Sequence, residues 1–346
     1  MKIKKKVISD LPLCYWVTTL DIKGELYFLV ASEKAYSCLL FDKYGKQIDE
    51  VWKEPGGTMT AVQVPGSDGA FLATHRMYSP DDNREASIVL AYPVEGAWKI
   101  KTLCHLQGVH RFDILRRYGV NYLIACTIKS NYEYENDWRF PGKVFVARLP
   151  EDLEGLPEGY ELPLTVLRDK VLKNHGYSRD LYEGVETAVV TSEEGVFRFI
   201  PPAEPSGDWT MEQYLDEPTS DALFLDLDGD GEKEMLTFSP FHGDTLKVFK
   251  KCGGAYTKVF EYDKKLPFIH AICPAQFDGR EAAVVGYRRA ERDLLLVSFV
   301  DGAFRVDLLD HDVGSANARA AVVDGKTVVV SANREISEVA YYTLEA

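Results

Sequence analysis

The chain has 346 residues, 46% of them apolar, and a formal net charge of −14. A chain of this composition can bury a large core, and no segment approaches the ~18 uninterrupted apolar residues of a membrane span. Proteins that bind a nucleic-acid backbone usually carry a basic face, which the acidic balance argues against. These features indicate a soluble globular protein with neither a membrane nor a nucleic acid as partner.

The N-terminal segment, residues 1–8, begins with basic residues but has neither the apolar stretch nor the cleavage site of a secretory signal. We therefore expect a cytoplasmic protein. None of the six cysteines shows Cys-x-x-Cys spacing. In the cell interior such cysteines stay reduced, and we interpret them as small apolar strand residues.

Seven glycines recur at nearly even steps of 45, 50, 65, 47, 48 and 46 residues: Gly24, Gly69, Gly119, Gly184, Gly231, Gly279 and Gly325. Each lies between two short apolar runs, which is typical of a hairpin turn, where glycine adopts a positive φ at least cost. A period of about 40–50 residues with roughly four short strands indicates a propeller blade. The sequence predicts an all-β, seven-bladed β-propeller in a single domain, residues 1–346.

With these glycines as the register, the blades are expected at residues 12–54, 56–105, 108–168, 172–215, 218–263, 267–310 and 313–346. The last segment supplies only about three strands, at 316–323, 326–332 and 338–344. An N-terminal strand at 2–9 completes this blade and closes the ring, since an open edge is avoided in propellers; the alternative is a frayed tail. The third blade carries two insertions, 130–141 and 150–163, and long loops are often functional.

Three of the seven histidines share one position in the repeat. Nine residues before each turn glycine lie Tyr15, Thr60, His110, His175, Ala222, His270 and Ala316, at the expected start of each innermost strand. Inner strands line the channel, so these imidazoles are expected to converge on one cavity. A second divalent metal in the channel is one hypothesis, although the width of a seven-bladed channel argues against all three reaching one ion. Hydrogen-bonded structural histidines are the alternative.

The loops after the second strands add basic, imidazole and phenol groups to the same face: His75, Arg76, Lys129, His242, Tyr287, Arg288, Arg289 and Arg334. Trp138 lies in the first insertion. Arginine binds a carboxylate in bidentate fashion, tyrosine and histidine exchange protons, and an indole can stack on a sugar. The pattern favours an anionic, hydroxylated ligand such as a uronic acid; the alternative is that these arginines are simply solvated.

A second motif places acidic side chains around a glycine-rich turn. Asp226, Asp228, Asp230 and Glu234 present several hard oxygens to one point, which favours calcium. Because the turn lies at the end opposite the expected pocket, this Ca²⁺ is expected to be structural. A metal-free polar turn is the alternative.

The segment from Ala222 to Glu234, Ala-Leu-Phe-Leu-Asp-Leu-Asp-Gly-Asp-Gly-Glu-Lys-Glu, resembles the FG-GAP or VCBS-type repeat of calcium-binding propellers. The channel histidines with loop tyrosine and arginine are similar to those of propeller-fold polysaccharide lyases acting at uronic acids, the ulvan lyase and rhamnose-glucuronate lyase type. This resemblance implies β-elimination next to a uronic acid in an oligosaccharide.

In that chemistry Arg288, with Arg76, neutralises the carboxylate, and His110, His175 and Tyr287 are the candidate base and acid. The expected substrate contacts are His75, Lys129, Trp138, His242, His270, Arg289 and Arg334. Two alternatives use the same residues: a sugar dehydratase or epimerase, and a non-catalytic propeller that binds a glycan or a protein. A concave, histidine-lined pocket favours an enzyme, whereas histidines buried in strand contacts favour a binding protein.

Overall fold

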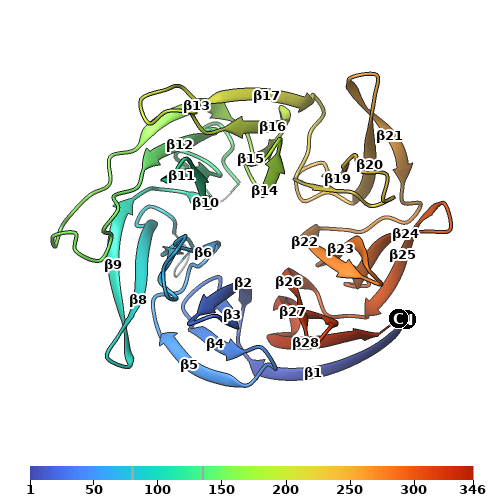
Figure 1. Cartoon of the computed structure of the whole chain (residues 1–346), viewed down its shortest axis with the longest axis horizontal. Helices are drawn as coiled ribbons and strands as arrows, with labels where there is room; N and C mark the ends of the chain where they lie inside the picture. The colour runs from blue at the N-terminus through green and yellow to red at the C-terminus, as the bar shows by residue number, and fades with distance from the viewer. Residues whose placement is uncertain (79–81, 135, 346) are drawn as a thin grey trace.

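The computed structural model describes residues 1–78, 82–134 and 136–345. Its strands form seven four-stranded antiparallel sheets set around a central axis (Figure 1), which confirms the prediction of an all-β, seven-bladed propeller. Residues 79–81, 135 and 346, in the predicted second blade, first insertion and last blade, lie outside the described residues. Within the described part of the chain, no helix is long and apolar enough to cross a membrane.

The blades follow one another along the chain, and in each the first strand lies nearest the axis and the fourth at the rim (Figure 1). The first blade contains β2 (Cys14–Ile22), β3 (Glu25–Ser32), β4 (Cys38–Asp42) and β5 (Gln47–Trp52). The second contains β6 (Ala61–Gln63), β7 (Phe71–His75), β8 (Ser87–Val94) and β9 (Ala97–His105). The third contains β10 (Val109–Arg117), β11 (Val120–Thr127), β12 (Gly142–Arg148) and β13 (Thr165–Val171).

The remaining blades have the same order. The fourth contains β14 (Tyr177–Tyr182), β15 (Val185–Ser192), β16 (Gly195–Ile200) and β17 (Thr210–Leu215). The fifth contains β18 (Asp221–Leu225), β19 (Glu234–Ser239), β20 (Thr245–Cys252) and β21 (Ala255–Glu261). The sixth contains β22 (Ile269–Phe277), β23 (Arg280–Tyr287), β24 (Leu294–Val300) and β25 (Ala303–Asp310). The seventh contains β26 (Ser315–Val323), β27 (Lys326–Asn333), the 3-10 turn η1 (Arg334–Ile336), β28 (Glu338–Glu345) and the N-terminal β1 (Lys2–Asp10).

The hydrophobic core is distributed around the ring. Seven clusters of buried apolar side chains among the described residues fill the seven gaps between neighbouring blades. Second strands are covered on both faces and therefore read as continuous apolar runs; in β27 seven of the eight residues are buried. Because each gap supplies its own core, the axis is left to polar side chains.

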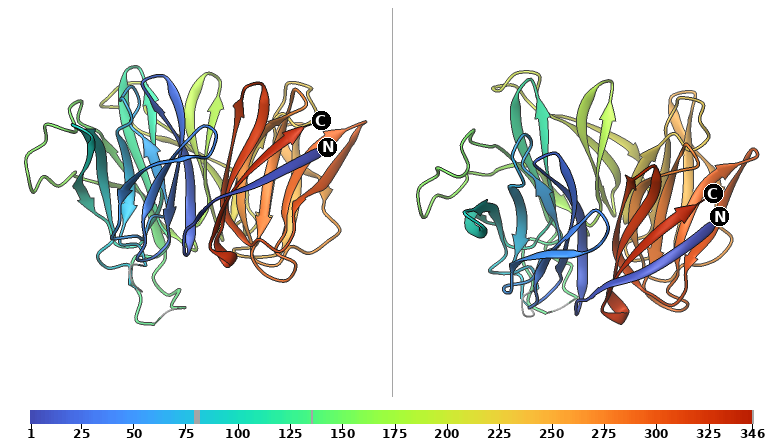
Figure 2. Two further views of the ribbon diagram at one scale, coloured as in Figure 1. Left: turned by 90° about the horizontal axis from the view of Figure 1, so that it is seen from below. Right: turned by 60° about the horizontal axis from the view of Figure 1, so that its bottom comes forward.

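The N-terminal strand closes the ring as predicted. β1 pairs with β28 in antiparallel register from Lys2 opposite Glu345 to Asp10 opposite Glu338. Lys5 adds ion pairs of 2.8 Å to Asp310 and to Glu338. The two chain ends therefore lie together at the rim (Figure 2).

The ring has two faces, which we name by what they carry. The histidine face holds the starts of the first strands and the loops after the second strands, including η1 and the described residues of the insertion at 130–141, which extend from the ring in Figure 2. The hairpin face holds the turns between first and second strands, including the predicted turn glycines. The positive φ of these glycines, such as 81° at Gly119, agrees with the predicted turns.

Deleting residues 2–10 is expected to open the ring, because β28 then loses its only outer hydrogen-bond partner strand. We expect the melting temperature to fall by at least about 5 °C and the exposed edge to promote association. Thermal unfolding and size-exclusion chromatography measure both effects. A Lys4→Gln, Lys6→Gln chain keeps the strand and serves as control; an unchanged melting temperature in the deletion would contradict closure by β1.

Candidate functional site

The side chains expected at the starts of the inner strands do meet near the axis. In four inner strands the pairing register skips one residue near this end, and the skipped residues are Tyr15, His110, His270 and Ala316. A β-bulge leaves its extra residue unpaired and re-aims the side chain. His175 reaches the same layer just before β14 begins. The repeat position identified in the sequence is therefore a structural layer.

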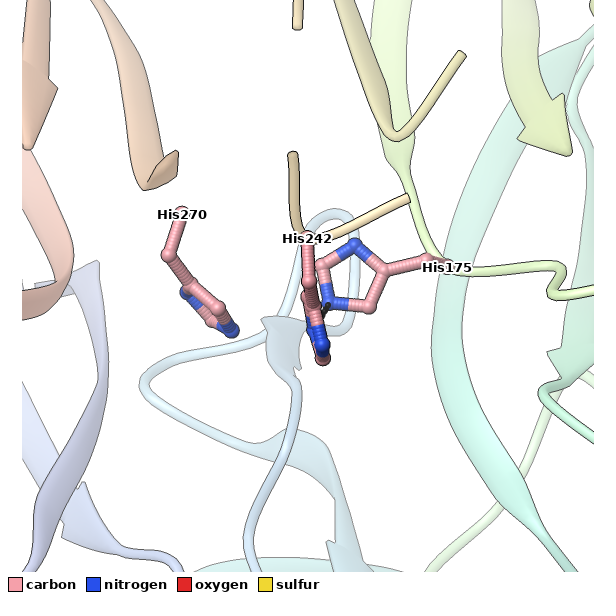
Figure 3. A group of neighbouring side chains, drawn as sticks. All are labelled: His175, His242 and His270. Carbon is pink, nitrogen blue, oxygen red and sulfur yellow. Dashed lines mark hydrogen bonds between the residues drawn. The ribbon is translucent and has the colours of Figure 1, made fainter. Parts of the chain in front are cut away.

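Hydrogen bonds and ring contacts join this layer into one cluster, which we call the histidine cluster: Tyr15, His110, His175, His242 and His270. The Tyr15 hydroxyl lies 3.3 Å from Nε2 of His110 and 3.2 Å from Nε2 of His270. Nε2 of His242, from the loop between β19 and β20, lies 3.3 Å from Nε2 of His175. Figure 3 shows His175, His242 and His270 pointing toward one another. Their ligand atoms all lie within 4.8 Å of one another.

Three of these rings are oriented by an acceptor on their other nitrogen. Nδ1 of His175 lies 3.0 Å from the Asp221 carboxylate, Nδ1 of His270 lies 2.6 Å from the Ala316 carbonyl, and Nδ1 of His110 lies 3.2 Å from the His175 carbonyl. Carboxylate and carbonyl oxygens only accept, so each Nδ1 carries the proton. In the neutral rings Nε2 therefore presents a lone pair to the centre of the cluster.

The centre of the cluster is short of protons. Three Nε2 lone pairs, on His110, His175 and His270, face two donors among the described residues: the Tyr15 hydroxyl and, at best, one N–H of His242. One lone pair is left without a hydrogen. A buried acceptor without a donor costs about 1–3 kcal/mol, and a cation placed among these nitrogens removes that cost.

Burial keeps His110, His242 and His270 from protonating. His110, His175 and His270 are 3%, 1% and 2% exposed. Burial, together with neighbouring positive charge, holds the pKa values of His110 and His270 well below their usual range. Burial, then the neighbouring His175 and Arg288, lower the pKa of His242 to about 2. The Nε2 lone pairs of His110 and His270 are therefore available at neutral pH.

Aromatic side chains cover the cluster on the histidine face. Phe241 stacks on His242 with ring centroids 3.9 Å apart, and Phe268 lies 4.3 Å from the same imidazole. Trp138 packs edge-on against Phe241 at 5.2 Å, and the Lys129 ammonium lies 4.4 Å from the centre of the Trp138 ring. Trp138 and Lys129 therefore belong to this cover, at one remove from the cluster.

Two of the four predicted arginines of this face are engaged by carboxylates. Arg288 pairs with Glu335 at 2.7 Å, and Arg334 pairs with Glu33 and with Glu335. Arg289 is exposed. The guanidinium of Arg288 is still close enough to lower the pKa values of His242 and His270, and the charge of Arg289 also lowers the pKa of His242.

Two predicted site residues pack between neighbouring blades. His75 packs against Trp52, with ring centroids 4.5 Å apart, and burial with the adjacent charge of exposed Arg76 lowers its pKa to about 4. Tyr287 packs in the core between the fifth and sixth blades and donates to Asp293 at 2.9 Å. Burial and this hydrogen bond raise the Tyr287 pKa. Neither residue is brought to the histidine cluster.

The acidic turn brings three of its four predicted ligands together. Carboxylate oxygens of Asp226, Asp228 and Glu234 lie within 4.8 Å of one another. The ammonium of Lys250 lies among these groups: it contacts Asp228, and is 2.7 Å from Asp230 and 2.9 Å from Glu234. A lysine in this place neutralises part of the charge that would attract calcium. The calcium site stays a prediction, in competition with Lys250.

Three residues of the site were not assigned to it from the sequence. Tyr15 shares the repeat position of the histidines, so its place in the repeat was a usable signal. Asp221 and Arg111 lie beside such positions. The Arg111 guanidinium lies 5.7 Å from the centre of the Tyr15 ring and its charge lowers the pKa of His110. No pattern in the sequence marks either residue as part of the cluster.

Comparison with known proteins adds no identity. Neither a scan against models of known protein families nor a search of curated protein sequences gave a match.

Replacing His75 with phenylalanine is expected to reduce the acid sensitivity of the fold. The folded state keeps His75 neutral down to about pH 4, whereas the unfolded imidazole takes a proton near 6.5. The unfolded state therefore binds more protons between these values, and stability falls as pH falls through this window. Phenylalanine keeps the Trp52 contact. We expect its loss of unfolding free energy between about pH 7 and about pH 4.5 to be smaller by about 2–3 kcal/mol.

Urea unfolding at several pH values measures this difference, and His105→Gln, at an exposed histidine, is the control. Equal pH dependence in His75→Phe and the natural chain would show that His75 is not held neutral by the fold.

Replacing Lys250 with methionine is expected to strengthen calcium binding at the acidic turn. The change removes the ammonium and leaves the carboxylates in place, so calcium should raise the melting temperature of this variant more than that of the natural chain. At a hundredfold excess over Kd, bound calcium stabilises by about 3 kcal/mol. Adding Asp228→Asn should abolish the gain. If calcium stabilises neither chain, the turn is a metal-free polar turn.

Proposed function

We propose that the histidine cluster is a transition-metal centre and that the protein is a metal-dependent enzyme acting on an anionic carbohydrate. The observation that supports the metal centre is a shortage of hydrogen-bond donors: the described residues of the cluster contain more buried Nε2 lone pairs than N–H and O–H groups to satisfy them. His175, His242 and His270 are the ligands in this proposal. The width of the channel argued against three histidines from inner strands reaching one ion. In this proposal only His175 and His270 come from the starts of inner strands, and His242 reaches the ion from a loop.

The donor set fits such an ion. Two nitrogens bound at about 2.0–2.1 Å in a tetrahedral site lie about 3.3–3.4 Å apart, and the Nε2 atoms of His175 and His242 are 3.3 Å apart. The Asp221 carboxylate on Nδ1 of His175 is the kind of outer partner that metal-binding histidines have. Imidazole ligands suit zinc, copper, iron and nickel, whereas calcium and magnesium prefer oxygen. When bound, such an ion acts as a Lewis acid that polarises an oxygen.

For the reaction we propose β-elimination next to a uronic acid. In this step a base removes the C5 proton, the C4–O bond breaks as the C4–C5 double bond forms, and an acid protonates the departing oxygen. His110 is neutral and can accept a proton, and the Tyr15 hydroxyl bound to it can return one. Arg288 on the histidine face, or the arginines of the channel, supply the charge that neutralises the carboxylate. The resemblance of the sequence to propeller-fold uronate lyases supports this choice.

One observation favours a second candidate function. His110, His175 and His270 are 1–3% exposed, whereas His242 is partly exposed, so no substrate touches the first three without movement of the aromatic cover or entry through the channel. A non-catalytic propeller that uses the metal to hold its axis together and binds a glycan or protein elsewhere meets this constraint directly. A sugar dehydratase or epimerase needs the same access as the lyase.

Metal analysis of the purified chain tests the centre. We expect about one zinc-class ion per chain after loading and dialysis, and its loss in His175→Ala and in His242→Ala. His105→Ala, at an exposed histidine outside the cluster, should retain the ion. No retained ion in the natural chain would refute the metal centre.

The reaction is tested by the ultraviolet absorbance of the unsaturated uronate formed from glucuronate- and galacturonate-containing oligosaccharides. We expect absorbance to rise with the loaded protein and the rate to fall at least about a hundredfold in His110→Ala. A retained ion with no product on any substrate would favour the binding propeller over the enzyme.

A further inference from the structure

A cavity of about 430 Å³ occupies the channel beside the histidine cluster. Its lining includes Arg111 and Asn317, which directly follow the cluster layer on β10 and β26. Along β22, exposure rises from buried His270 through half-buried Ile272 to exposed Pro274. The cavity thus begins where the histidine cluster ends and opens toward the hairpin face.

The charges on this lining are mostly positive. Its charged members are three arginines, Arg111, Arg179 and Arg319, and one carboxylate, Asp113. Asp113 is already engaged, because Nε of Arg179 donates to it at 2.9 Å and a second guanidinium nitrogen contacts its other oxygen. Arg111 and Arg319 therefore have no carboxylate partner among the described residues, in a chain whose net charge is −14.

Arg111 is an unusual place for an unpaired charge because it is only 4% exposed. It donates to the carbonyl of Met59 and lies 5.0 Å from the Trp16 ring centre and 5.7 Å from that of Tyr15, but no described carboxylate pairs with it. A buried charge without a counter-charge is costly. Arg319 adds a buried Nε that has no hydrogen-bond partner among the described residues.

We propose that the channel cavity binds an oxyanion, a carboxylate or phosphate on a small hydroxylated molecule, between Arg111 and Arg319. A guanidinium binds either group through paired N–H donors and stays charged at any pH of interest. The volume lies within the ~300–1,000 Å³ range of small-molecule sites. Thr18, Thr60, Ser178 and Asn317 on the same lining can bind hydroxyl groups.

This anion site is separate from the proposed metal centre and lies between the histidine cluster and the hairpin face. The ligand enters from the hairpin face, whereas the sequence pattern pointed to the histidine face. If the protein is a uronate enzyme, the cavity places the carboxylate directly beneath the cluster. Anion binding itself needs neither the metal nor the reaction, so the two proposals can fail separately.

Calorimetric titration of the natural chain with glucuronate, galacturonate and inorganic phosphate tests the site, with neutral galactose as the uncharged comparison. We expect at least one anion to bind and galactose not to bind, and affinity to fall as salt is raised. Binding of a uronate but not phosphate assigns a carboxylate ligand, and the reverse assigns a phosphate. The titration is repeated after treatment with a chelator, and the affinity should be unchanged.

Two variants locate the site. Arg319→Gln should weaken binding at least about tenfold, the loss expected when a charged hydrogen bond is removed. Arg305→Gln, at an exposed arginine on the rim strand β25, should bind as the natural chain does. Arg111→Lys keeps the buried positive charge but removes the paired N–H donors of the guanidinium, and it should also weaken binding. No binding of any anion, or unchanged affinity in both Arg319→Gln and Arg111→Lys, would overturn the proposal.

Discussion

Face-to-face packing of the blades is the constraint on which the rest of this structure depends. Each gap between blades is filled by its own apolar cluster, so stability does not require an apolar plug at the axis. The first strands can therefore direct polar side chains inward. Closure by β1 matters for the same reason, because an open ring would let the gap between the seventh and first blades separate and would lose the convergence at the axis.

The polar axis is divided into two layers of opposite chemical character. The histidine layer offers lone pairs with too few protons, whereas the layer beneath it offers guanidinium N–H groups with too few acceptors. The first suits a cation and the second an anion. Each layer would be costly alone. Placed next to each other, the two layers suit a cation and an anionic ligand bound together. The arginines repel the cation and the histidine lone pairs repel the anion, and the attraction between the two bound ligands offsets both effects.

The fold could be predicted from sequence periodicity because the repeated residue, glycine, marks a backbone conformation that recurs in every blade. A hairpin turn needs positive φ, and a glycine recurs wherever a first strand turns into a second, so blade number and boundaries follow from spacing. The missing outer strand of the last blade pointed to residues 2–9 in the same way. The first inference uses the local geometry of a turn, and the second uses the need to complete a four-stranded blade.

The site was only partly predictable, because it depends on features with no local signature. The shared repeat position of His110, His175 and His270 was visible, but the bulges that turn His110 and His270 inward are departures from regular pairing that the sequence does not announce. Lys250 is distant in sequence from the acidic turn it neutralises, so an acidic motif alone could not reveal its counter-charge.

The engagement of Arg288 by Glu335 changes which arginines can recognise an anion. Sequence composition made the loop arginines of the histidine face the natural candidates, because neutralising partners cannot be seen in a sequence. In the fold those loops supply glutamates alongside the arginines. A ligand therefore meets only the net charge that remains after the glutamates have neutralised the arginines they pair with. The channel has an excess of positive charge, since Asp113 pairs with only one of its three arginines, Arg179. The axis of this acidic protein therefore holds buried positive charge that no described carboxylate pairs with, and low solvent access there makes each guanidinium more effective than it would be on a loop.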